Sequence, residues 1–145
     1  MPRLIHQKTV ISCMGIIITQ KHNITYVVLL RDKDNCWVIP KGHNENDENF
    51  IETAIREVKE ETGININKYN LISKISEYEY YSDKEKCDKL IKAYLFKIAK
   101  KAQIIPLYKE NFVEGKWFPI DEAIKIVTYK EQKEVLNKVI KDLSK

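Results

Sequence analysis

The amino-acid sequence predicts an α+β fold: an α/β/α sandwich in which helices flank a central mixed β-sheet. The first reason is the order of segments along the chain, which runs from β-rich to helical, back to β-rich, and then to two helices. The second is length, because 145 residues suit one domain that buries a core. The third is continuity, since no linker, repeat or low-complexity segment interrupts the chain. We therefore expect a single domain over residues 1–145.

Strand patterns dominate the first forty residues. Residues 10–19 and 24–32 are rich in β-branched and apolar side chains and are joined by the polar stretch QKHN, which predicts a strand, a turn and a second strand. Residues 36–40 predict a third strand that ends at Pro40. The polar segment KGHNENDEN that follows predicts a loop.

Residues 49–62 carry the clearest helical pattern. Asn49 and Glu52 have capping-box spacing, and Gly63 stands where a glycine commonly ends a helix. Apolar side chains recur on one face of this helix at Ile51, Ala54, Ile55 and Val58. Further along, the patterns predict a hairpin of residues 71–81 and 89–99, a short strand at 117–120, a helix capped by Asp121, and a last helix through 134–143.

Composition excludes several function classes. Lys and Arg total 25 against 21 Asp and Glu, and a net charge of +4 is too small to indicate nucleic-acid or membrane binding. The apolar runs are too short to span a bilayer. Three cysteines without CxxC spacing, and no apolar leader in the first ten residues, favour reduced thiols. We expect a soluble, cytoplasmic monomer with no membrane or nucleic-acid partner.

Three glutamates crowd the end of the helix over residues 49–62. Glu57, Glu60 and Glu61 fall within one turn, with Glu57 and Glu60 away from the apolar face and Glu61 on its border. Like charges at this spacing repel by about 0.2–0.5 kcal/mol a pair, and a helix C-terminus disfavours anions. A solvated, Glu-rich surface helix is the simplest alternative. For this stretch alone that alternative is favoured, because charge runs are usually exposed faces.

The full segment over residues 42–64 changes that interpretation. It fits the pattern G-x5-E-x7-R-E-U-x-E-E-x-G-U, where U is aliphatic. The matching residues are Gly42, Glu48, Arg56, Glu57, Val58, Glu60, Glu61, Gly63 and Ile64. This resembles the signature of the Nudix hydrolases at every position and implies the Nudix fold and hydrolysis of a phosphoanhydride bond.

The resemblance also implies roles for the signature residues. Glu57, Glu60, Glu61 and the carbonyl of Gly42 would hold Mg²⁺ or Mn²⁺, as hard oxygen ligands do. Arg56 would orient the glutamates, and Glu48 would be structural. A water activated by the metal would attack phosphorus, with Glu61 as the expected base because burial at its border position would raise its pKa.

The flanking segments point to a substrate. Residues 36–43, CWVIPKGH, resemble the W-x-x-P-K-G-H segment of asymmetric dinucleoside tetraphosphate hydrolases, and KLIKAYLF and the segment from Phe112 to Leu136 are similar to that group. The implied reaction converts diadenosine tetraphosphate to ATP and AMP. W-x-x-P-K-G also occurs in diphosphoinositol polyphosphate hydrolases. A Nudix domain could instead act on nucleoside triphosphates, ADP-ribose, or capped or 5′-triphosphate RNA, or serve as a non-catalytic nucleotide sensor.

The same resemblance implies further site residues. The implied substrate contacts are Lys41 and Lys89 on phosphates, His43 at the pocket mouth, and Tyr129 with one of Tyr80 and Tyr81 on adenine. Each could equally be a solvated lysine, an exposed histidine or a packing tyrosine. The choice between the two tyrosines depends on strand register. Glu114 would reach the metals from a loop, and Glu110 is the rival candidate for that role.

Overall fold

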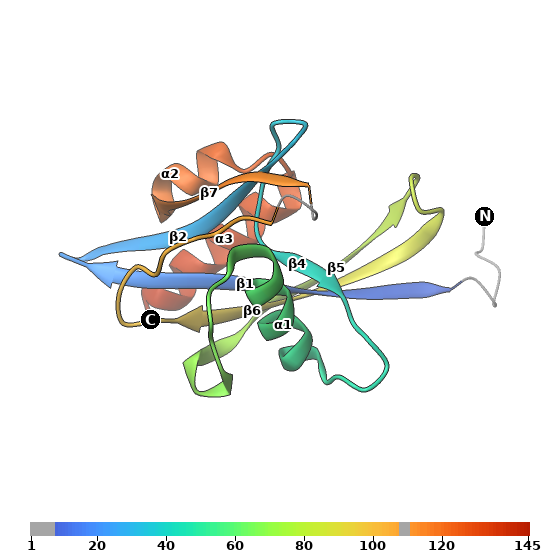
Figure 1. Ribbon diagram of the computed structural model, residues 1–145, viewed down its shortest axis with the longest axis horizontal. Coiled ribbons are helices and arrows are strands. Elements are labelled where there is room, and N and C mark those ends of the chain that lie inside the picture. Colours follow the sequence, from blue (N-terminus) through green and yellow to red (C-terminus); the bar gives the residue numbers. More distant parts are fainter. Residues whose placement is uncertain (1–7, 108–110) are drawn as a thin grey trace.

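The computed structural model describes residues 8–107 and 111–145 and contains one seven-stranded mixed sheet (Figure 1). The strands are β1 Thr9–Lys21, β2 Ile24–Asp32, β3 Trp37–Val38, β4 Lys41–His43, β5 Leu71–Ser82, β6 Cys87–Lys97 and β7 Phe112–Pro119. The helices are α1 Phe50–Thr62, α2 Ile120–Ile126 and α3 Lys130–Leu143, and the 3₁₀ turn η1 spans Lys68–Asn70. The strand order is β3-β2-β1-β6-β5, with β4 paired to β1 and β7 paired to β2.

The sheet is mixed because its central pair, β1 and β6, is parallel, while every other pairing is antiparallel. The predicted first hairpin is present: β1 and β2 meet at His22 and Asn23, whose φ angles of 51° and 65° suit a tight hairpin turn. The predicted hairpin of β5 and β6 is present too.

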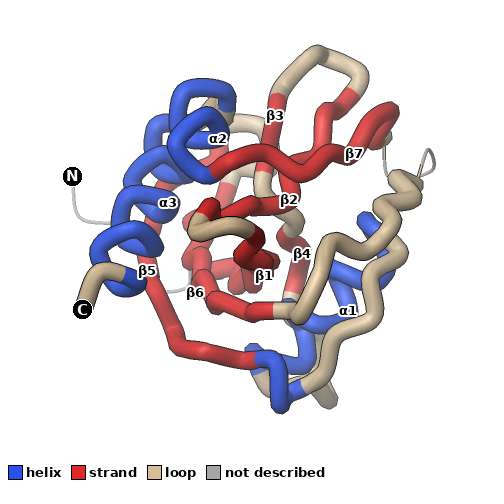
Figure 2. The backbone as a smooth tube through the Cα atoms, turned by 90° about the vertical axis from the view of Figure 1, so that its left-hand side faces the viewer, coloured by secondary structure: helices blue, strands red, loops and turns tan. Residues whose placement is uncertain are grey.

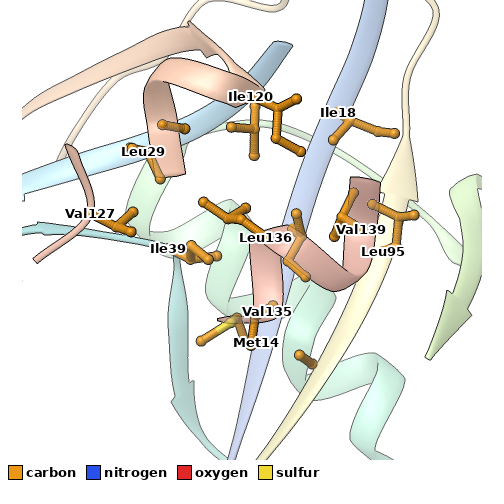
Figure 3. Close-up of a cluster of buried hydrophobic side chains, with 14 of the residues drawn as sticks. Met14, Ile18, Leu29, Ile39, Leu95, Ile120, Val127, Val135, Leu136 and Val139 are labelled. Atoms are coloured by element: carbon orange, nitrogen blue, oxygen red, sulfur yellow. The ribbon is translucent and has the colours of Figure 1, made fainter. Parts of the chain in front are cut away.

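Helices cover both faces of the sheet, which confirms the predicted α/β/α arrangement (Figure 2). The protein has two hydrophobic cores, one on each face of the sheet. Side chains of β1 point alternately into one core and the other, as the two-residue period of a strand requires. Met14 and Ile18 pack with α2 and α3 (Figure 3), and Ile16 belongs to the same core, whereas Cys13 and Ile17 pack with α1. Among the described residues, no helix has the length and apolarity that crossing a bilayer requires.

Several predicted boundaries were wrong. Residues 41–43, predicted as loop, form β4, because their backbone pairs with residues 12–14 of β1 although their side chains lack a strand pattern. The strand β7 extends well before residue 117. Asp121 does not cap α2, since the cap position belongs to Pro119 and no side chain bonds there. The last helix begins at Lys130, one turn earlier than predicted.

Candidate active site

The helix α1 begins and ends close to where the sequence predicts. The Asn49 side chain accepts a 2.8 Å hydrogen bond from the backbone N–H of Glu52, which caps the N-terminus. The carboxylate of Glu52 accepts from the Asn49 side chain at 2.7 Å rather than from its backbone. At the other end, Gly63 has a φ of 77° and donates its N–H to the Lys59 carbonyl. These caps set where the three glutamates lie relative to β4.

Glu57 lies directly against β4. A Cβ atom at Gly42 would overlap the carboxylate of Glu57, so only glycine allows this approach of helix to strand. Glu57 is 8% exposed, although the sequence places it away from the apolar face of α1. The reason is that β4 covers this side of α1, and β4 was not predicted.

The other two glutamates differ in exposure. Glu61 is 5% exposed, and one of its carboxylate oxygens accepts a 3.0 Å hydrogen bond from the backbone N–H of Lys41. The Glu60 side chain is 44% exposed and is the most open of the three. The structure therefore brings Glu57, Glu60, Glu61 and Gly42 to one place, with Glu60 at its solvent side.

Arg56 ties this cluster together. Its guanidinium donates to Glu57 at 2.8 Å and to Glu60 at 3.1 Å, and it also donates to the His43 carbonyl at 2.8 Å. Two further bonds, of 2.6 and 3.0 Å, go to the carboxylate of Glu48. Such a forked contact is the strong geometry for arginine and a carboxylate. It lowers the pKa of Glu48 to about 2, with a smaller contribution from Thr53.

The loop before α1 contains bracing residues that the sequence did not single out. The Thr53 hydroxyl donates to Glu48 at 2.9 Å, and the Asn44 side chain donates to that hydroxyl at 2.8 Å. Asn44 also donates to the Glu48 carbonyl at 3.2 Å. Neither residue type is fixed in the signature, so pattern alone could not identify them. Together they hold Glu48, and through it Arg56, in place.

The predicted phosphate contacts lie around one cavity. Lys41, Gly42, His43, Lys89 and Tyr129 are among the residues that line a space of about 280 Å³ next to β4. The structure thus brings Lys89 to Lys41 and His43, although 46 residues separate His43 from Lys89 in the sequence. Burial, followed by the positive charge of Lys89, lowers the pKa of Lys41. This concentration of positive charge suits a polyanion.

Glu85 is a member of this group that the sequence did not indicate. Its carboxylate pairs with the Lys89 ammonium at 2.6 Å and lies 3.6 Å from the His43 ring. The hydrogen bond from Lys89 lowers the pKa of Glu85. Lys89 itself is 6% exposed and lies 3.4 Å from the His43 ring nitrogen. In a polar turn, Glu85 had no pattern that could distinguish it from its neighbours.

A second cavity, of about 400 Å³, adjoins the first. It is lined by Lys41, Tyr78, Tyr80, Tyr129, Glu131 and Gln132. Lys41 and Tyr129 line both cavities, so the two are neighbours that share part of their walls. The register of β5 places Tyr80 on this wall, whereas Tyr81 is 44% exposed and lines neither cavity. Tyr78 and Gln132 were not predicted, because both stand among polar and charged residues, in SEYEYY and KEQKE, where no pattern separates them from their neighbours.

The predicted extra carboxylate is separate from the signature cluster. Glu114 lies on β7, where its carboxylate accepts a 3.0 Å hydrogen bond from Arg31 on β2. No contact between Glu114 and the signature glutamates is seen in the described chain. The rival candidate, Glu110, lies outside the described residues.

A divalent cation fits the chemistry of the cluster. Its donors are carboxylate and carbonyl oxygens, which Mg²⁺ and Mn²⁺ prefer. No three acidic, histidine or cysteine side chains of residues 8–107 and 111–145 already converge as a metal site. Arg56 instead provides the positive partner of Glu57 and Glu60. The three free cysteines, Cys13, Cys36 and Cys87, are not among the lining residues of either cavity.

Comparison with known proteins agrees with this geometry. A model of the NUDIX domain matches residues 10–143. The asymmetrical bis(5′-nucleosyl)-tetraphosphatase of Mus musculus is 30% identical over 131 residues, covering 84% of this chain and 88% of its own. The Caenorhabditis elegans enzyme of the same name is 29% identical over 132 residues, which cover 89% of this chain and 94% of the C. elegans enzyme. A crystal structure of a C. elegans Ap4A hydrolase binary complex superposes with a TM-score of 0.78 at 26% identity. The superposition covers 93% of this chain and 98% of the C. elegans chain. The chain therefore belongs to the Nudix family of hydrolases, enzymes that act on phosphoanhydride bonds.

Proposed function

We propose that this enzyme hydrolyses diadenosine tetraphosphate to ATP and AMP with Mg²⁺ or Mn²⁺. The observation that carries the proposal is the pair of adjoining cavities. One is walled by Tyr80 and Tyr129 and suits a nucleobase, and the other holds Lys41 and Lys89 and suits phosphates. The mouse and C. elegans relatives, whose names state this activity, support the same substrate.

The signature residues would hold the cation. Glu57, Glu60, Glu61 and the Gly42 carbonyl offer the oxygen donors, and Arg56 keeps two of the carboxylates oriented. When bound, the cation would neutralise phosphate charge and make water a stronger nucleophile.

The remaining steps fall to side chains of the chain itself. Glu61 is the proposed base: the Lys41 N–H holds one of its oxygens at 3.0 Å, which leaves the carboxylate with a defined orientation for taking a proton from water. The Lys41 and Lys89 ammonium groups would bind the polyphosphate and the charge that develops on it. Tyr80 and Tyr129 would stack on the base, with Tyr81 outside the site.

The reaction class is tested by Glu60→Gln and Glu61→Gln. Each should lower kcat by two or more orders of magnitude, roughly the effect of losing a catalytic acid–base group, while the circular dichroism spectrum stays unchanged. Glu134→Gln, the same change on the exposed side of α3, is the matched control and should retain full activity. Near-normal turnover by both site variants would rule out the assigned cluster.

The substrate is tested by a panel assayed with Mg²⁺. The panel contains diadenosine tetraphosphate, nucleoside triphosphates, ADP-ribose, a diphosphoinositol polyphosphate, and capped or 5′-triphosphate RNA. We expect the highest kcat/KM with diadenosine tetraphosphate, and ATP with AMP as its products. A much higher value with another member would show that the tyrosine-walled cavity serves a different ligand. Binding of diadenosine tetraphosphate with no turnover of any member would favour a sensor.

A further inference from the structure

Gln132 is a buried amide in the first turn of α3. It is 2% exposed, and its side-chain oxygen accepts a 2.9 Å hydrogen bond from the backbone N–H of Ile39. Its backbone N–H donates to the carbonyl of Tyr129 at 3.1 Å. One helical turn therefore positions both this amide and a tyrosine of the 400 Å³ cavity.

The contact with Ile39 determines which way the amide faces. A backbone N–H only donates, so the atom facing it must be the Gln132 oxygen, and the NH₂ group faces away from Ile39. Within residues 8–107 and 111–145, no acceptor takes a hydrogen bond from that NH₂ group. Gln132 lines the cavity together with Tyr80 and Tyr129. The Gln132 Nε2 atom is not one of the fully buried unpaired side-chain atoms of the described chain, so it borders the cavity, and the cavity's occupant is the expected acceptor.

We propose that Gln132 is a specificity-determining residue whose side-chain Nε2 donates a hydrogen bond to a ring nitrogen of the adenine bound between Tyr80 and Tyr129. The inference rests on the proposed function, since it assumes that the cavity takes an adenine nucleotide. Stacking alone accepts every base, because every base has an aromatic face. A buried donor adds selectivity, since a base without a matching acceptor leaves that donor unpaired.

A purely structural role for Gln132 would explain its side-chain oxygen, which pairs with Ile39, but not its NH₂ group. Pairing the Ile39 N–H requires an acceptor, and a glutamate would supply one in the same place. The NH₂ group is not needed for that contact. Ile39 also precedes Pro40 and Lys41, so the Gln132 contact connects the base cavity to the strand that carries the phosphate-binding lysine.

The experiment measures the dissociation constants of AMP and of its 1-, 3- and 7-deaza analogues. AMP has no phosphoanhydride bond, so its binding is separate from hydrolysis. Wild-type protein should bind one analogue about tenfold more weakly than AMP, the effect of one unpaired buried donor. The analogue that loses affinity identifies the ring nitrogen.

Two variants show whether Gln132 is the donor. Gln132→Glu keeps an acceptor for Ile39 and adds a charge that weakens all four ligands alike, whereas Gln132→Met removes both polar atoms. In both variants the difference between AMP and the deaza analogue should disappear. Asn137→Asp is the matched control, an amide-to-acid change at an exposed position of α3, and should keep the tenfold difference.

Equal binding of AMP and all three analogues by the wild-type protein would overturn the inference, whatever the variants do. A difference that persists in both Gln132 variants would overturn it as well. Turnover of diadenosine tetraphosphate reports separately on the proposed function. Hydrolysis without base discrimination would refute only the role of Gln132, and discrimination without hydrolysis would refute only the substrate.

Discussion

The carboxylate of Glu57 occupies the space beside Gly42 that a Cβ atom would need. This contact joins α1 to β4, and β4 is itself paired to the buried centre of β1. Arg56 donates a 2.8 Å hydrogen bond to the same carboxylate. The position of the glutamate cluster on the sheet therefore depends on a glycine that belongs to a different element.

Gly42→Ala should consequently damage the site and the fold together. The added methyl group must displace the Glu57 carboxylate, and overpacking of this kind costs about 1–3 kcal/mol of unfolding free energy. We expect kcat to fall about a hundredfold, as it does when reacting groups are displaced by an ångström. Steady-state assays and urea unfolding measure the two effects.

Glu57→Ala supplies the control for this prediction, because it empties the space that the methyl group needs. The stability cost of Gly42→Ala should be smaller in the Glu57→Ala background than in the wild type. An equal cost in both backgrounds would show that Gly42 is required for another reason, such as backbone conformation.

Glu48 should make stability depend on acid. Its folded-state pKa of about 2 lies below the ordinary value of 4.5, so its stabilising contribution is fully present above pH 4.5. That contribution is lost as pH falls from 4.5 towards 2. Glu48→Gln should lower the unfolding free energy at pH 7 by about 1.5–3 kcal/mol, typical of a charged hydrogen bond, and flatten the acid limb of the stability curve.

Urea unfolding at several pH values measures this effect, and Glu45→Gln is its control. Glu45 is mostly exposed and lies 3.7 Å from Arg56, so its replacement should leave the acid limb unchanged. If the Glu48 variant and wild type lose stability in parallel below pH 4.5, another carboxylate is responsible for the acid sensitivity.

Local signals explain what the sequence could predict. The helix α1 was placed correctly because Asn49 and Gly63 are terminal signals that act within a few residues. The first hairpin was placed correctly because its strands have a clear apolar pattern and its turn does not. The nine signature positions are also local, so the glutamates could be proposed as site residues before their surroundings were known.

Contacts between distant segments explain what the sequence could not predict. The strand β4 exists through its pairing with β1, about thirty residues earlier, and its own residues Lys41, Gly42 and His43 show no strand period. The burial of Glu57 follows from β4 and was missed with it. Gln132 and Ile39 meet across 93 residues, and only the folded chain makes that amide stand out from a core side chain.

Mg²⁺ should stabilise the folded enzyme through the glutamate cluster. A ligand that binds only the folded state adds RT ln(1 + [L]/Kd), about 2.7 kcal/mol at a hundredfold excess over Kd. We expect Mg²⁺ to raise the melting temperature of the wild-type protein, and Glu60→Gln to lose most of that rise because Glu60 is the open carboxylate. Scanning calorimetry with and without Mg²⁺ measures it.

Glu134→Gln is the control here and should keep the whole increase in melting temperature. An undiminished increase in Glu60→Gln would place the stabilising cation elsewhere. Because the measurement needs no substrate, it tests the cation site independently of the substrate proposed.

Tyr80 and Tyr81 allow the base cavity to be tested with adjacent residues. Tyr80 lines the cavity and Tyr81 lies on the outer side of the same strand. Loss of one aromatic stacking partner costs about 1–3 kcal/mol of binding, so Tyr80→Leu should raise KM for diadenosine tetraphosphate roughly 5- to 150-fold. Tyr81→Leu should leave KM near the wild-type value, and Tyr80→Phe should also keep KM near that value because phenylalanine stacks as tyrosine does.

Since Tyr80 packs against the core, melting temperatures of all three variants must accompany the kinetics. The opposite ranking, with Tyr81→Leu impaired and Tyr80→Leu normal, would mean that β5 pairs with β6 one residue out of the register that forms this cavity.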